Sequence, residues 1–582
     1  MQLLSLGQPC RNFQILGIGR FIDPRDEREK VVLSNFAAGS TGSLVIVDPG
    51  TGAGEDIRLP GDSGAWAVLN WRDEKLLIGT CGSYGYLHCL DLATRQWAEP
   101  LRDPNETYIW NLCVGSDGVV YGGTYPGCVL LRYHPDEHRL ENLGRVSDAA
   151  GNLYSRTVYG GIPGHILIAC GTAEPHLALW SMATGQARRF GRPGASVREI
   201  GPDFVCTQTG DQRDFYDLHT LEPLNADLSG RLSAGGPPPR FQGMSMSIQL
   251  ADGRTLATRG QEYYIDAGGP ELPALRPIPA ERPATHILTV TADEGGRIWG
   301  AAGFGQTIFR CDPATGESWN SQVVTDKGGE VYGMAAARGR LFLATYSGGD
   351  HVVYDPEAAW SQIDNTNPRT LEPVGPRLIR PAAKSVIGPD GHFWTGWMAA
   401  YGVYGGGLSR VKVDTLDMTS WYDPVPGQAL AGLAADDRHL YFTTSGAANG
   451  LSSREVTPHF AVWDAEGQIA WERVFAAGTV LGPLAAVAGR VLLVVGQRLE
   501  IFDPESRTFT GALDLPAPCL YLAALPDGRA AAFGADHLWL IDSAAGQVTD
   551  AGAVPGRAGS LAVTPDDQVY VAIGTDLYHM EL

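Results

Sequence analysis

Short apolar runs separated by glycine- and aspartate-containing turns recur along almost the whole chain. The clearest example is GSDGVVYGGTYPGCVLLRYHPDEHRLENLG at 115–144, where a DG turn, an aromatic-rich run and a further apolar run ending in a polar turn follow one another. Similar segments lie at 294–316, 337–360, 388–418 and 526–547. Alternating apolar positions without a long 3.6-residue period predict β-strands joined by tight turns, and therefore an all-β chain.

The repeat has the length of a propeller blade. Its third strand is predicted to end at about thirteen places between Asp48 and Leu577, at intervals of roughly 45 residues. A single propeller has about four to eight four-stranded blades, so this number predicts two β-propellers, of roughly seven and six blades. A β-solenoid is the alternative, although its repeats are shorter and more regular.

The residues that begin the predicted innermost strands differ along the chain. Between about 65 and 428 they include aromatic and basic side chains, whereas elsewhere they are mostly small and apolar. We therefore expect 65–428 to form a seven-bladed propeller that carries the functional face. Residues 1–64 together with 429–582 would form a second propeller closed by both termini. Two consecutive propellers divided near residue 320 are the alternative.

Composition excludes several function classes. The chain has 44 Lys+Arg against 65 Asp+Glu, a net charge of −21, which disfavours binding to nucleic acid or anionic membranes. No apolar stretch predicts a transmembrane helix. Nine scattered cysteines without a CxxC motif predict neither a disulfide framework nor a structural zinc site. The first residues lack the regions of a signal peptide, so we expect a cytoplasmic protein, or a secreted one if a leader has been removed.

Candidate ligand-binding residues gather at the starts of predicted innermost strands and in the loops that should meet them. Both positions surround one face of a propeller. Aromatic rings stack on sugars and guanidinium groups bind carboxylates, so this mixture predicts a site for an anionic sugar. The predicted substrate-binding residues are Tyr108, Trp110, Tyr125, Arg240, Tyr346, His351, Arg380, Lys384, Trp397 and Tyr401. Any single Tyr or Trp also has a structural explanation, because aromatic residues favour strands.

Common catalytic motifs are absent. The sequence has no P-loop, no dinucleotide-binding fingerprint in a strand–helix context, no HExxH and no GxSxG. No cofactor is expected, and a divalent metal is left open, with His176, His286, His351 and His459 as candidate ligands. The expected partner is an acidic oligosaccharide or another small molecule. No nucleic acid or membrane partner is expected, and a protein partner is left open.

Several segments resemble those of bacterial propeller proteins related to uronate-specific polysaccharide lyases, of the rhamnose–glucuronate and ulvan lyase type. The resemblance covers roughly 105–410. It rests on ETYIWNLCVGSDGVVYGGTYPGCVLLRYHP, GRVSDAAGNLYSRTVYGG, GGEVYGMAAARGRLFLATYSGGDHVVYDPEAAW and RPAAKSVIGPDGHFWTGWMAAYGVYGGGLSRV. These lyases are commonly secreted, and a cytoplasmic relative would act on imported oligosaccharides.

The resemblance implies β-elimination, in which a uronate carboxylate is neutralised, a base removes the C5 proton and an acid protonates the leaving oxygen. It assigns the carboxylate to Arg156 with Arg240 or Arg380, and the base and acid roles to Tyr154, Tyr332 or His286. The predicted catalytic residues are thus Tyr154, Arg156, His286 and Tyr332. Two alternatives stay open. One is a non-catalytic propeller that binds a protein or ligand, and the other is a streptogramin-lyase-like enzyme acting on a small molecule.

Overall fold

The computed structural model describes residues 2–233, 240–241, 246–325, 327–372, 374, 377–464 and 467–582. These residues form antiparallel sheets of mostly four strands, joined by turns, with a single 3-10 helix at η1 (Ser229–Arg231). The sheets are the blades of two β-propellers, as the apolar pattern predicted. Within the described part of the chain, no helix is long and apolar enough to cross a bilayer.

The chain divides into two compact units, which are described separately. Unit 1 consists of Met1–Phe13 and Arg282–Leu582, and unit 2 of Gln14–Glu281. Unit 2 is therefore an insertion between the first strand of unit 1 and the rest of it. The insertion leaves and returns through paired backbone, because Asn12 N–H donates to the Pro283 carbonyl (3.1 Å) and Thr285 N–H to the Cys10 carbonyl (3.0 Å).

Unit 1 is built on seven innermost strands in its described residues. Each contacts the next, and the last contacts the first, so the strands close a ring. In order they are β25 (Ile287–Ala292), β29 (Val331–Ala337), β34 (Ser385–Ile387), β38 (Ala429–Ala435), β42 (Leu481–Val487), β46 (Tyr521–Ala524) and β50 (Ala558–Val563). Each begins a sheet that runs outward by antiparallel pairing, such as β38, β39 (Leu440–Ser445), β40 (His459–Trp463) and β41 (Ile469–Val474).

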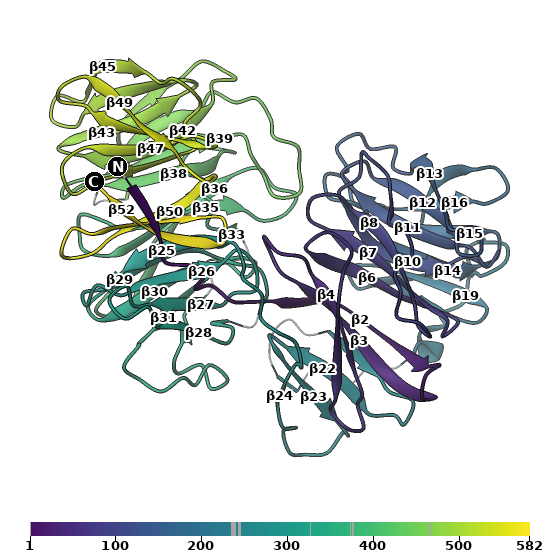
Figure 1. Ribbon diagram of the computed structural model, residues 1–582. Helices are drawn as coiled ribbons and strands as arrows, with labels where there is room; N and C mark the ends of the chain where they lie inside the picture. Colours follow the sequence, from purple (N-terminus) through teal and green to yellow (C-terminus); the bar gives the residue numbers. More distant parts are fainter. Residues whose placement is uncertain are drawn as a thin grey trace. The chain divides into compact units, whose positions relative to one another are not determined.

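The last sheet of unit 1 is completed by the other end of the chain. Its strands are β50, β51 (Val569–Ile573), β52 (Asp576–Glu581) and finally β1 (Gln2–Ser5). Figure 1 shows purple β1 beside yellow β52, with both termini at this sheet. Leu3 of β1 packs against the buried cluster that contains Leu538 and Met580. The two ends of the chain thus meet in one blade of unit 1, although the predicted segments, 1–64 and 429–582, are not those of this ring.

Unit 2 has six blades in its described residues, of which the second and third belong to one eight-stranded sheet. Their innermost strands are β2 (Gln14–Asp23), β6 (Gly64–Trp71), β10 (Tyr108–Val114), β14 (Tyr154–Ile162), β18 (Ser196–Ile200) and β21 (Ser247–Gln249). β2, β6, β10 and β14 contact one another in turn, and β21 contacts β2. The hydrophobic core of each unit lies between blades, as where Val32 and Leu44 of one sheet pack with Ile78 and Leu90 of the next.

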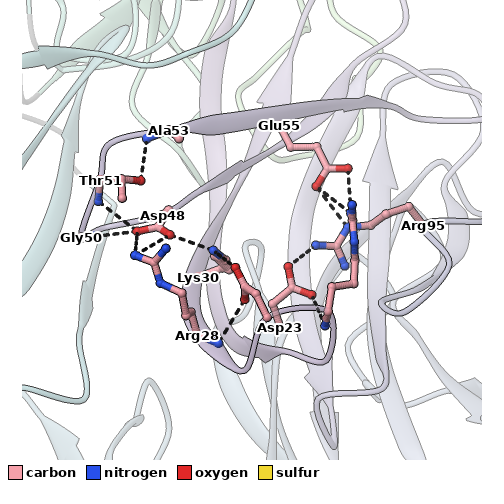
Figure 2. A network of polar contacts seen from close by, with 11 residues as sticks. Asp23, Arg28, Lys30, Asp48, Gly50, Thr51, Ala53, Glu55 and Arg95 are labelled. Atoms are coloured by element: carbon pink, nitrogen blue, oxygen red, sulfur yellow. Dashed lines mark hydrogen bonds and ion pairs between the residues drawn. The ribbon is translucent and has the colours of Figure 1, made fainter.

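A network of ion pairs joins the first blade of unit 2 to the second, because Arg95, after β8 (Tyr86–Asp91) of the second blade, pairs with Asp23 and Glu55 of the first (Figure 2). The buried Lys30 ammonium bonds Asp26 (2.7 Å) and Asp48 (2.8 Å), and Asp48 also accepts the N–H groups of Gly50 and Thr51. Burial would raise the pKa of Asp48, but these bonds hold it below its usual value. Asp48 is thus a turn residue that stabilises its own loop.

The predicted division into 65–428 and the remainder is wrong, and so is a division near 320. The boundaries lie at 13/14 and 281/282. The prediction assumed that aromatic and basic strand starts mark one ring and small ones the other. In unit 1, however, His286 and Lys384 belong to the same ring as strands that begin with small residues, Ala429 and Ala558. Basic and aromatic residues precede or begin only some of its innermost strands.

Candidate functional site

Both units bring chemistry-bearing side chains to the end where innermost strands begin, which we call the start face. Most innermost strands have a register break there, for example between Ile287 and Thr289 in β25 and between Ala558 and Ser560 in β50. Such a bulge leaves one residue outside the ladder and redirects its side chain and carbonyl. Several blades therefore each place a side chain and a backbone carbonyl that lie outside the strand pairing at the centre of the start face.

Lys384 uses two of these carbonyls in unit 1. It lies directly before β34, yet its ammonium donates to the carbonyls of Gly559 in β50 and Leu288 in β25 (3.4 Å to the latter). In the ring β34 is flanked by β29 and β38, so the side chain crosses the centre to reach these strands. Burial, and then the nearby Arg557, lowers the pKa of Lys384 to about 8.

His286 lies next to this lysine. A Cβ placed on Gly559 would be 3.9 Å from His286 Nε2, so the imidazole and the Lys384 ammonium flank the same glycine. Burial lowers the pKa of His286, and the charges of Lys384 and Arg557 lower it further. The imidazole is therefore neutral at neutral pH. In the described residues, no carboxylate forms an ion pair with any of these three basic groups.

A second group lies on the same face, around Arg380. Its Nη1 donates to the Tyr332 hydroxyl (2.5 Å), its Nε donates to Asn449 Oδ1 (2.7 Å), and the guanidinium lies 3.9 Å from the centre of the Tyr346 ring. The Tyr346 hydroxyl bonds that of Tyr401 (2.5 Å), a partly exposed residue. We call Tyr332, Tyr346, Arg380 and Tyr401 the phenol–arginine cluster.

Glu330 lies against this cluster. Burial raises the pKa of its carboxyl to about 7, although Arg380 opposes the shift. Its buried Oε2 has no hydrogen-bond partner among the described residues. Burial also raises the pKa of Tyr332 to about 12, with Glu330 adding to the shift and Arg380 opposing it. Acids and bases whose pKa values are shifted toward neutrality, gathered with a hydrogen-bonded phenol, are typical of catalytic sites.

The start face of unit 2 has a different character. Five partly exposed aromatic rings contact one another there, with centroids 4.9–5.7 Å apart. We call them the aromatic wall: Trp66, Tyr108, Trp110, Tyr125 and Tyr154. The exposed Arg156 guanidinium lies 5.3 Å from the centre of the Trp110 ring.

Comparison with known proteins finds only distant similarity, and only to solved structures. No protein-family profile matches the chain, and no curated protein does. Among solved structures, a streptogramin B lyase has 14% identity and a TM-score of 0.39, over 52% of this chain and 94% of that one. A catalytically inactive virginiamycin B lyase from Staphylococcus aureus with quinupristin has 10% identity and a TM-score of 0.40, over 58% and 99%. The extracellular domain of a putative one-component system from B. thetaiotaomicron has 12% identity and a TM-score of 0.28, over 100% and 83%.

The structure divides the predicted site residues between the units. His286, Tyr332, Tyr346, Arg380, Lys384 and Tyr401 belong to unit 1, and Tyr108, Trp110, Tyr125, Tyr154, Arg156 and Arg240 to unit 2. The predicted catalytic set of Tyr154, Arg156, His286 and Tyr332 is therefore not one group within either propeller. His286 and Tyr332 lie with other predicted residues of unit 1, and Tyr154 and Arg156 with other predicted residues of unit 2.

Three predicted substrate-binding residues lie elsewhere. His351 and Trp397 are buried in the core of a blade, where both bond the Ser409 hydroxyl (2.8 and 2.7 Å). Burial lowers the pKa of His351 to about 4. Arg240 lies 3.7 Å from Asp266, at the end of its blade opposite the start face. His351 and Trp397 were misplaced because strand side chains alternate between faces, and residue type does not reveal the phase. Arg240 lies in a connection outside any strand, where this alternation gives no signal.

The histidines suggested as metal ligands do not gather. His459 pairs with Glu472 (2.7 Å), and His176 Nδ1 contacts the Glu174 carbonyl (2.8 Å). Within the described ranges, no three His, Cys, Asp or Glu side chains form a group that could hold a metal ion.

Sequence reasoning did not select Glu330, Arg557 or Asn449 as site residues. Glu330 and Arg557 both lie close before an innermost strand, the position that identified His286 and Lys384. Asn449 lies in a long loop after β39, and only its bond to Arg380 shows its role. The positional signal was therefore available for two of the three.

Proposed function

We propose that unit 1 is a lyase that cleaves uronic-acid-containing saccharides by β-elimination at its start face. One observation carries the proposal: a neutral imidazole, three cationic groups and a hydrogen-bonded phenol all lie on this one face. Elimination next to a carboxylate needs these three kinds of group, a base, a charge that neutralises the carboxylate and an acid.

The uronate carboxylate would bind between Lys384 and Arg557. The ammonium has three donors, of which two go to the carbonyls of Gly559 and Leu288, so one remains for a ligand. Arg557 is exposed and brings a second positive charge to the same place. Neutralising the carboxylate makes the C5 proton of the sugar more acidic, because the carbanion-like charge that develops is then stabilised.

His286 would be the base and Tyr332 the acid. The imidazole takes the C5 proton, the electron pair of that bond forms the C4=C5 double bond, and the C4–O bond breaks. The leaving oxygen takes the proton of the Tyr332 hydroxyl, which is available because that oxygen accepts its hydrogen bond from Arg380. His286 and Tyr332 belong to the neighbouring strand starts of β25 and β29. Arg380 acts as a positioning residue.

The test is the formation of unsaturated uronate, followed by ultraviolet absorbance. The full chain would be incubated with glucuronate-, galacturonate- and ulvan-derived oligosaccharides, with and without a divalent metal. We expect product from at least one of them. Tyr332→Phe removes the proposed acid and should lower kcat by about 10²–10⁴-fold.

Tyr422→Phe is the matched control. The exposed Tyr422 lies in the outer strand β37 (Met418–Tyr422) of the same unit, and its hydroxyl donates to the Val374 carbonyl (3.0 Å). This variant should leave the rate unchanged. No product from any of these saccharides, or equal rates for Tyr332→Phe and Tyr422→Phe, would overturn the assignment.

A further inference from the structure

Four innermost strands of unit 2 each direct one aromatic or basic residue toward the centre by the same device. Register breaks fall at the third residue of β6, β10, β14 and β18, which is Trp66, Trp110, Arg156 and Arg198 respectively. The Trp66 and Trp110 rings lie 5.3 Å apart, and Arg156 lies over Trp110, so bulged side chains of neighbouring blades meet. Of these four residues two are aromatic and two are basic, whereas the same break in β2 falls at the buried Leu16.

The aromatic half keeps surface open to solvent. All five residues of the aromatic wall are partly exposed, although they lie at the start of innermost strands or beside them. Other large rings of unit 2 pack into its core. Tyr121, in the strand that pairs with β10, is fully buried. In addition, the buried Trp110 Nε1 has no acceptor among the described residues. An indole donor in this state needs an explanation, and a ligand oxygen would supply one.

The basic half is free of carboxylates. Arg156 and Arg198 are both exposed, and neither forms an ion pair within the part of the chain that the structure describes. The only contact of Arg198 at hydrogen-bond distance there is the Ser233 carbonyl (3.4 Å). The whole chain has an excess of acidic residues, 65 against 44 basic ones, so exposed arginines usually have carboxylate neighbours available. Two exposed arginines at the same position of their innermost strands, one of them over the Trp110 ring, suit an anionic ligand.

We propose that the start face of unit 2 is a binding site for a carboxylated sugar. The sugar face would stack on the aromatic wall, a ring or hydroxyl oxygen would accept from Trp110 Nε1, and the carboxylate would pair with Arg156 and Arg198. The proposal gives this site a binding role only. It is independent of the proposed elimination in unit 1.

The experiment compares methyl glucuronoside with methyl glucoside, which differ only in the carboxylate. Binding to the full chain is followed by calorimetry and by tryptophan fluorescence, since Trp66 and Trp110 line the site. We expect saturable binding of the glucuronoside with a change in fluorescence, and at least tenfold weaker binding of the glucoside. Arg156→Gln should weaken glucuronoside binding at least tenfold, and Trp110→Phe, which removes the indole donor, should weaken it severalfold.

Two controls separate this site from unit 1 and from general charge effects. Arg213→Gln removes an exposed arginine from β20 (Gln212–Asp217), an outer strand of unit 2, and should leave the affinity unchanged. Lys384→Met alters the start face of unit 1 and should leave the fluorescence change intact. Equal affinity for both glycosides, no saturable binding, or loss of the fluorescence change in Lys384→Met but not in Arg156→Gln would each overturn the proposal.

Discussion

Glu330 shows how a residue's surroundings set its chemistry. Burial raises the pKa of its carboxyl to about 7, whereas in an unfolded chain a glutamate has a pKa of about 4.3. Between these two values the folded protein holds a proton that the unfolded chain has released. The free energy of unfolding therefore falls as the pH rises through this window, and the loss is complete above pH 7.

Glu330→Gln should remove this dependence, because the amide stays neutral at every pH. We expect the variant to match the parent near pH 4 and to exceed its free energy of unfolding above pH 7 by about 3–4 kcal/mol. Thermal unfolding measured across this pH range tests it. Glu581→Gln, at an exposed carboxyl in β52, is the control and should shift both ends of the range alike. A constant difference between Glu330→Gln and the parent would contradict the assigned pKa.

Residue type alone could not separate the site from the core. His286 and His351 are both histidines that the sequence placed on a functional face, and burial lowers the pKa of both. His286 meets Lys384 on the start face, whereas His351 bonds Ser409 inside a blade. The first precedes an innermost strand and the second lies in a third strand, β31 (Asp350–Tyr354). Position in the blade was the informative signal, and aromatic or basic character was not.

At the scale of elements, the short strand β1 closes unit 1. It pairs with β52 from Gln2↔Glu581 to Ser5↔Tyr578 and is the outermost strand of its sheet. Neighbouring leucines in β1 face opposite sides, because strand side chains alternate. Leu3 packs against the core between the last two blades, and Leu4 is exposed.

This alternation gives a matched pair of variants. Leu3→Asp places a charge against the apolar core and should lower the free energy of unfolding of unit 1 by about 2 kcal/mol. Leu4→Asp changes an exposed position and should lie within about 0.5 kcal/mol of the parent. Scanning calorimetry of the full chain measures both. A similar effect of the two changes would show that β1 does not close the ring in this register.

Strand repeats were predictable at this scale, because turns and alternating apolar residues are local signals. The predicted third-strand end at Asp91 coincides with the end of β8 (Tyr86–Asp91), and that at Asp542 with β48 (His537–Asp542). The role of β1 was not predictable in the same way. Four residues carry no repeat, and the partner strand lies at the far end of the chain.

At the scale of the whole molecule, one propeller is inserted into the other, and a local repeat cannot show this. The blade repeat continues unchanged across residue 281, because the blades of either ring have the same antiparallel structure of mostly four strands. Ring membership depends on contacts between distant segments, such as β50 against β25. The predicted boundaries of the nested rings rested on strand-start chemistry, which varies within a ring.

The insertion point predicts that the two units can be separated. Residues 10–12 and 283–285 are hydrogen-bonded side by side, so a short glycine- and serine-rich loop can join Phe13 to Arg282 without moving either end. We expect the joined unit 1 and the isolated 14–281 each to unfold in one cooperative transition, because each has its own core between blades.

Separation also assigns the two proposed activities, since each depends on side chains of one unit. The joined unit 1 should retain the elimination activity. It lacks Arg156, so the glucuronoside binding that depends on this residue should be lost. The isolated 14–281 should retain that binding with its change in tryptophan fluorescence and form no unsaturated product. Circular dichroism first establishes that each piece is folded. Elimination by the isolated 14–281 would contradict the assignment of this activity to unit 1. So would an inactive but folded unit 1, if the full chain is active.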